Sequence, residues 1–201
     1  DLYDRLNTNF PQVLFESCAS GGGRFDPGIL YYAPQGWASD DSDAVERLKI
    51  QYGTTFGYPI SSIGSHVSVA PNHQVFRNTP LHTRANVAYF GTFGYELDLN
   101  KLTKEEQEAV KGQIAFMKEY RELLQFGTFY RLVSPFEGNI TCWMVVNEEQ
   151  TEAIVGWYRT LSHVNMPYTR VRLHGLRPDL CYVEQNTEKS YYGDELMNIG
   201  L

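Results

Sequence analysis

The sequence predicts an α/β fold in which β-α repeats with parallel strands are followed by a small antiparallel sheet. Up to about residue 126, short apolar runs alternate with helical patterns, which is the rhythm of parallel strands joined by helical crossovers. After Gly127, runs rich in β-forming residues are separated by turn sequences, as at residues 137–139 and 177–179. With 42% hydrophobic residues among 201, the chain can bury a sizeable core.

The first predicted elements are short. Residues 1–7 are expected to end a helix, and the apolar run at residues 12–17 predicts a buried strand that leads into a glycine loop. A further short segment spans residues 36–39, before acidic residues that are typical of a helix N-terminus. The helix that follows has three apolar residues on one face: Val45, Leu48 and Tyr52.

Two more strands and two more helices complete the first half. Residues 60–69 predict a strand, residues 81–90 a helix and residues 95–99 a last strand. Thr103 and Glu106 form a capping box that begins the longest helix. Its apolar stripe consists of Val110, Ile114, Met117 and Leu124.

The second half is expected to be a small antiparallel sheet, because its apolar runs are short and follow one another without helical patterns. These runs are residues 131–133, 140–146, 153–158, 170–173 and 180–184. We place the boundary near residues 126–129, which gives domains 1–127 and 128–201.

Composition excludes several classes of protein. A net charge of −7 and a pI near 5.2 argue against a nucleic-acid partner, which would call for a basic patch. There is no apolar run of the roughly 20 residues that a membrane span needs, and no signal-peptide pattern, so no membrane partner is expected. Three widely spaced cysteines do not suggest a disulfide framework, which favours a reducing cytoplasm.

Three carboxylates precede the helix at residue 44. For Asp43, three residues before Glu46, helix capping is the favoured interpretation. Crowded carboxylates also raise one another's pKa, which can make one of them a proton donor, so Asp40 or Asp41 is a candidate for catalysis. Trp37, three residues before Asp40, is a candidate for stacking on a sugar ring.

The other candidate motifs favour structural roles. The loop at residues 18–24 (CASGGGR) is open to three interpretations: a tight turn, which is favoured, a phosphate cradle or a metal-thiolate site. His66 and His73 do not have a metal-ligand spacing, and hydrogen-bonded roles are expected for them. The same holds for His82, His163 and His174. No metal site is therefore expected.

Three segments together resemble bacterial α-galactosidases of glycoside hydrolase family 36: residues 16–26 (ESCASGGGRFD), 37–52 (WASDDSDAVERLKIQY) and 65–74 (SHVSVAPNHQ). The resemblance implies a retaining hydrolase that releases terminal α-linked galactose from melibiose, raffinose or stachyose without a metal or cofactor. It implies that residues 1–127 are the second half of a (β/α)8 TIM barrel and residues 128–201 a small antiparallel β-sandwich domain, whole or in part. Many such bacterial enzymes are tetramers, so a homotetramer is expected.

The resemblance also implies roles for individual residues. The acid/base of that family is an aspartate of a W-x-S-D-D motif, which falls on Asp40, with Asp41 as second choice. The S-C-x-S-G-G-G motif lines the galactose pocket in that family. The expected substrate-binding residues are therefore Cys18, Ser20 and Gly21, together with Arg24 and Trp37 as further members.

One motif of the family is missing. Its nucleophile is an aspartate in a K-W-D motif on an earlier barrel strand, and the 201 residues contain no K-W-D. Retention requires two carboxyl groups about 5–5.5 Å apart. We therefore expect an active parent enzyme whose N-terminal part supplies the nucleophile, and an inactive isolated chain.

Three alternatives remain open on sequence alone. The first is an inactive fragment that binds galactose or serves in assembly. The second is a phosphate-binding α/β protein that uses the glycine loop at a helix N-terminus, although the acidic residues near Asp40 argue against it. The third is a structural β-domain with a helical appendage, in which the acids are only helix caps.

Overall fold

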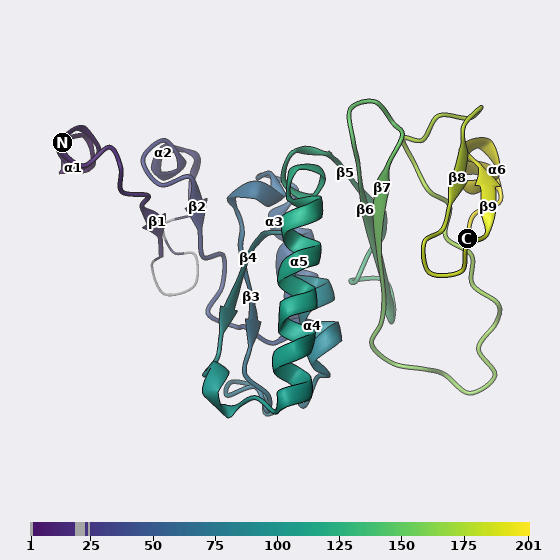
Figure 1. The fold of residues 1–201 in the computed structure, drawn as a ribbon, viewed down its shortest axis with the longest axis horizontal. Helices are drawn as coiled ribbons and strands as arrows, with labels where there is room; N and C mark the ends of the chain where they lie inside the picture. The colour runs from purple at the N-terminus through teal and green to yellow at the C-terminus, as the bar shows by residue number, and fades with distance from the viewer. Residues whose placement is uncertain (1, 19–22, 24) are drawn as a thin grey trace. The chain divides into compact units, whose positions relative to one another are not determined.

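The computed structural model describes residues 2–18, 23 and 25–201 (Figure 1). The chain divides into two compact units, Asp1–Glu119 and Tyr120–Leu201, each considered separately below. The expected domain boundary at residue 127 lies directly after the end of the longest helix and stays a prediction. Within the described residues, no helix combines the length and apolar character that a membrane crossing requires.

Among its described residues, the first unit contains four short parallel strands in chain order. They are β1 (Glu16–Ser17), β2 (Gln35–Gly36), β3 (Gly64–Ser68) and β4 (Thr92–Glu96). β1 pairs with β2 and β3 with β4 (Figure 1). A parallel bridge between Gly36 and Ile63 joins the two pairs. This is the strand order of one half of a (β/α)8 barrel.

Helices precede, connect and follow these strands. They are α1 (Leu2–Asn9), α2 (Pro27–Leu30), α3 (Ala44–Thr54), α4 (Leu81–Ala88) and α5 (Lys104–Phe126). The predicted capping box begins α5, since the Thr103 amide donates to Glu106 Oε2 at 2.9 Å and the Glu106 amide to Thr103 Oγ1 at 3.2 Å. Leu48 and Tyr52 of α3 are buried as predicted. In α5, Val110, Met117 and Leu124 are buried, whereas Ile114 is exposed.

Strand boundaries differ from those predicted. The strand expected at residues 12–17 is reduced to β1, and Val13 and Leu14 are exposed, because β1 pairs only with β2 among the described residues. The segment Ile60–Ser62 is a 3₁₀ helix that precedes β3. β4 begins three residues before the predicted start. The sequence prediction began too late because Gly94 lies inside the strand, and a glycine is usually taken to mark a turn. In β4, Gly94 lies opposite His66, and a Cβ at Gly94 would lie 2.9 Å from His66 Cδ2.

The second unit is built from antiparallel strands. They are β5 (Thr128–Val133), β6 (Ile140–Val146) and β7 (Ala153–Arg159), with β8 (Cys181–Val183) and β9 (Ser190–Tyr192) as a separate pair. A short helix, α6 (Gly193–Asn198), follows and was not predicted, nor was β9. The strand expected at residues 170–173 is wrong, although Val171 exchanges two backbone hydrogen bonds with Leu201, each 3.0 Å long.

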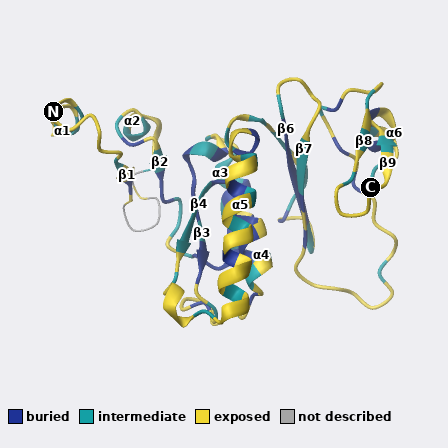
Figure 2. Ribbon diagram, viewed as in Figure 1, coloured by how far each residue is buried: buried dark blue, intermediate teal, exposed yellow. Residues whose placement is uncertain are grey.

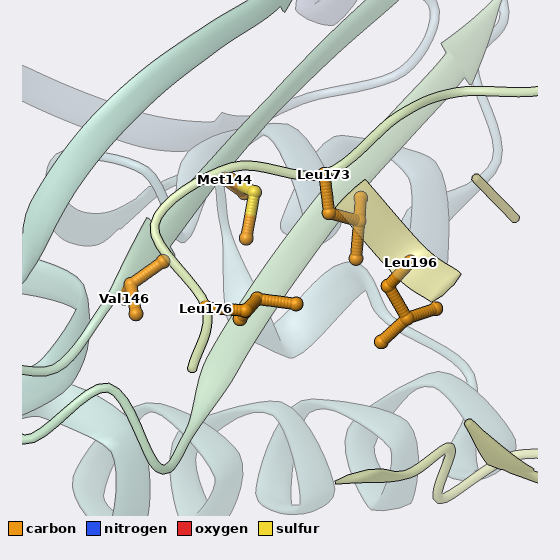
Figure 3. Close-up of a cluster of buried hydrophobic side chains, with 5 residues drawn as sticks. All are labelled: Met144, Val146, Leu173, Leu176 and Leu196. Carbon is orange, nitrogen blue, oxygen red and sulfur yellow. The ribbon is translucent and has the colours of Figure 1, made fainter. Parts of the chain in front are cut away.

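The core of this unit lies between the sheet and the elements that follow it. β6 is buried along almost its entire length (Figure 2). Figure 3 shows the central cluster, which consists of Met144, Val146, Leu173, Leu176 and Leu196. Tyr182 of β8 and Tyr191 of β9 pack against the same cluster, so the unit has two layers around one core.

Candidate active site

The acidic segment begins shortly after β2, beyond the carboxyl end of a parallel strand, where active sites of such folds lie. Asp43 caps α3, since its Oδ2 accepts the Val45 amide at 3.4 Å. It is also buried, with 1% of its surface exposed, and forms an ion pair with Arg77. The capping role predicted for Asp43 is therefore confirmed, and its charge is already matched.

The other two aspartates have different surroundings. Asp41 Oδ1 accepts the Asp43 amide at 3.0 Å, so its carboxylate helps to shape the turn into α3. The Asp40 side chain is exposed and makes no hydrogen bond with another described residue. The three carboxylates therefore lie in three distinct environments: Asp43 is buried, Asp41 is half-buried and Asp40 is exposed.

Trp37 lies beside this segment and is largely covered. The His66 ring stacks on it, with centroids 4.6 Å apart and planes inclined by 27°, and the Arg47 guanidinium carbon lies 4.6 Å from the ring centroid. Only 8% of Trp37 is exposed, which leaves little ring surface for a sugar. Stacking of Trp37 on substrate stays a prediction.

Arg47 is a buried cation that sequence reasoning missed. It donates from Nη1 to the Ser39 carbonyl at 3.3 Å, from Nη2 to the Gly64 carbonyl, and from Nε to Gln51 Oε1 at 3.3 Å. Burial lowers the pKa of Arg47 to about 10, while the nearby Asp41 carboxylate opposes that shift. The group therefore stays protonated at neutral pH and ties α3 and β3 to the segment that carries Asp40. No periodicity in the sequence marks an arginine for this role.

His66 lies in β3 and is half-buried. Its Nδ1 lies 3.6 Å from Glu96 Oε2 on the neighbouring strand, and its ring is stacked on Trp37. Among the described residues, no three His, Cys, Asp or Glu side chains come together as a metal site. His73 is exposed, and His163 forms a 2.8 Å hydrogen bond with Asn139 in the second unit.

The stack of His66 on Trp37 depends on the glycine opposite it. Replacing Gly94 with Ala is expected to push the imidazole off Trp37 and to lower the free energy of unfolding by about 1–3 kcal/mol, the usual cost of overpacking. Thermal unfolding monitored by calorimetry measures this. The matched control is Gly53→Ala within α3, where nothing lies within 4 Å of the new methyl group. It should stabilise the helix by up to about 1 kcal/mol, and equal effects at both sites would contradict the stacking argument.

The glycine loop is only partly described. Cys18 is exposed at its start, directly after β1. Ser20, Gly21 and Arg24 lie outside the described residues. Their expected contacts with a sugar stay predictions, as does that of Cys18.

Comparisons with known proteins agree with the motifs. The melibiase family matches residues 1–127, and the glycosyl hydrolase family 36 C-terminal domain matches residues 140–201. α-Galactosidase AgaA of Geobacillus stearothermophilus is 55% identical over 200 residues, which is all of this chain and 27% of that protein. The bifunctional α-galactosidase/sucrose kinase AgaSK of Mediterraneibacter gnavus is 47% identical over 201 residues, or 22% of its length. The chain thus spans about a quarter of the curated relatives it matches.

Solved structures match the fold of the chain. The crystal structure of AgaA superimposes with a TM-score of 0.97 at 54% identity, covering all of this chain and 28% of that one. A structure of an AgaA variant in complex with raffinose gives the same TM-score at 53% identity, with the same coverage of both chains. The predicted fold, a half-barrel followed by an antiparallel β-domain, is confirmed. On these matches, the chain belongs to glycoside hydrolase family 36, with a melibiase region followed by that family's C-terminal domain.

Proposed function

We propose that the natural protein is a retaining α-galactosidase that releases terminal α-linked galactose from oligosaccharides such as melibiose and raffinose. One observation carries the proposal: Asp40 of the W-A-S-D-D segment, beyond the carboxyl end of β2, has an exposed side chain that makes no hydrogen bond with another described residue. The identity of the whole chain to α-galactosidases supports the choice of substrate class.

The proposed mechanism uses Asp40 twice. Protonated Asp40 gives its proton to the glycosidic oxygen while a second carboxylate attacks the anomeric carbon, which forms a covalent galactosyl-enzyme. Ionised Asp40 then removes a proton from the water that releases galactose. The attacking aspartate of this family belongs to a K-W-D motif that these 201 residues do not contain. The activity is therefore proposed for the natural protein and not for the isolated chain.

The proposal assigns Asp41 a supporting role, because its carboxylate already accepts the Asp43 amide. Cys18, Ser20, Gly21 and Arg24 are proposed to contact the galactose hydroxyls. The two carboxylates supply all the acid, base and nucleophilic chemistry, so no metal or cofactor takes part in the proposed steps. A homotetramer in a bacterial cytoplasm is the setting that we propose.

Hydrolysis with retention is the test of this function. The natural protein incubated with raffinose should release galactose, and proton NMR should detect the α-anomer before mutarotation. The β-anomer as first product would contradict the retaining mechanism. Galactose binding in calorimetry without any release from raffinose would instead support a binding protein.

A further inference from the structure

Gln74, on the connection between β3 and α4, makes three hydrogen bonds to the segment that carries Asp40. Its Nε2 donates to the Asp40 carbonyl, and its Oε1 accepts from the Ser42 amide at 3.3 Å and from Ser42 Oγ at 3.2 Å. The Ser42 amide can only donate, so the amide oxygen of Gln74 must face it. The orientation of the side chain is thereby fixed.

Ser42 is the point where several elements meet. It is 2% exposed, and its carbonyl accepts from Ser68 Oγ of β3 at 2.8 Å. Its hydroxyl oxygen accepts from Asn72 Nδ2 at 3.2 Å while the hydroxyl proton is donated to Gln74. The residue that follows the Asp40–Asp41 pair is thus tied to β3 and to the neighbouring connection.

Gln74 is itself held in place by a rigid turn. Asn72 is buried, and its Oδ1 accepts the amides of Gln74 at 2.9 Å and Val75 at 3.1 Å. The Asn72 amide and carbonyl bond in turn to the Arg77 carbonyl and the Phe76 amide. Phe76 has a φ of 58°, which is strained for a residue with a large side chain. A turn fixed in this way can impose a position on its neighbour.

We propose that Gln74 is a positioning residue for the acid/base Asp40, setting the direction of its carboxylate through the backbone. The Asp40 side chain makes no hydrogen bond with another described residue, so its direction depends on its backbone, and Gln74 holds the carbonyl of that residue. Arg77 has a separate task, since it pairs with Asp43 and Glu46 at the start of α3. The proposal rests on the function proposed above.

The main test is Gln74→Ala in the natural protein, with raffinose and an activated aryl α-galactoside as substrates. Loss of three hydrogen bonds should lower kcat for raffinose by about 10- to 100-fold, since misplacement of a catalytic group by about 1 Å costs up to that much. KM should change by less than about threefold. Azide should accelerate turnover of the aryl substrate, because it attacks the galactosyl-enzyme without a base, and a general loss of structure would not produce this acceleration.

The control is the same substitution at a glutamine elsewhere in the first unit. Gln113 of α5 accepts the Tyr95 hydroxyl at 2.8 Å and does not contact the Asp40 segment. Gln113→Ala should keep raffinose kcat within about twofold of wild type and show no azide effect. Hydrogen exchange adds a direct readout, because the Ser42 amide should exchange faster in Gln74→Ala than in Gln113→Ala.

A second variant, Gln74→Glu, tests the proposal even if Gln74→Ala does not fold. Gln74→Glu has the same shape and keeps the oxygen that accepts from Ser42, but it loses the N–H donated to the Asp40 carbonyl. Its raffinose kcat should fall while the Ser42 amide stays protected. If Gln74→Ala does not fold, this variant alone decides.

The outcomes separate the two proposals. If Asp40→Ala loses raffinose hydrolysis and responds to azide, while folded Gln74 variants stay within about twofold of wild type, the role of Gln74 is overturned and the function stands. If Gln74 variants lose activity with no azide response, Gln74 is only structural and the inference is also overturned. If Asp40→Ala hydrolyses raffinose at the wild-type rate, the proposed function itself fails.

Discussion

Asp40→Asn in the natural protein is expected to lower kcat for raffinose by about 10²- to 10⁴-fold, the usual contribution of a general acid-base group. The amide keeps the size of the side chain but can neither donate a proton to the glycosidic oxygen nor accept one from water. The activated aryl galactoside needs no proton donation, so its first step should be nearly unaffected. Steady-state rates with both substrates, and a burst of aryl leaving group, measure the difference.

The matched comparison is Asp41→Asn. The Asn side chain keeps an oxygen that can accept the Asp43 amide, so only the charge is lost. Its effect on raffinose should stay below about tenfold, since the group does not exchange protons with substrate in the proposed mechanism. Asp40→Ala with azide should regain turnover of the aryl galactoside. If the ranking is reversed, and Asp41→Asn is the inactive variant, the acid/base role passes to Asp41.

Local patterns predicted most of the first unit. The capping box at Thr103 and the cap at Asp43 were predicted from spacing, because the groups that satisfy a helix N-terminus lie within one turn of it. The helical period likewise predicted most of the buried faces of α3 and α5, with Ile114 as an exposed exception. The start of β4 was misplaced, because a glycine in the sequence suggests a turn. In the structure, Gly94 lies within the strand, and a glycine is needed there because the His66 ring lies against it.

The contacts that shape the candidate site were not predictable from the sequence in this way. Gln74 reaches the Asp40 carbonyl across 34 residues, and Arg47 reaches Gly64 across 17. Neither contact leaves a periodic trace, since each depends on which strands become neighbours. The second layer of the second unit was missed similarly, because Leu173 and Leu196 find their partners only after the chain has returned to the sheet.

Arg47 is the group whose removal should cost the first unit most stability. It donates to the carbonyls of Ser39 and Gly64 and lies over Trp37, and only 2% of it is exposed. Gln51, the third partner of Arg47, keeps its other hydrogen bonds. Its Oε1 accepts from Ser65 Oγ at 2.9 Å. Its Nε2 donates to the carbonyl of Val87 in α4 and to that of Phe90, which follows α4. Removal of Arg47 therefore affects mainly the Ser39 and Gly64 carbonyls, which lose their donor, and the Trp37 ring, which loses the cation over it.

Arg47→Met is expected to lower the free energy of unfolding by about 3–5 kcal/mol, because two backbone acceptors lose a charged donor in a site that water does not reach. Burial already disfavours the cation, as the lowered pKa of Arg47 shows, and this offsets part of the loss. Calorimetric unfolding of the natural protein measures the change. Arg121→Met on the exposed face of α5 is the control and should stay within about 0.5 kcal/mol of wild type. Equal midpoints for the two variants would mean that the two carbonyls find another donor, such as a rearranged Gln51. The segment carrying Asp40 would then be held by its remaining hydrogen bonds to Gln74, Asn72 and Ser68.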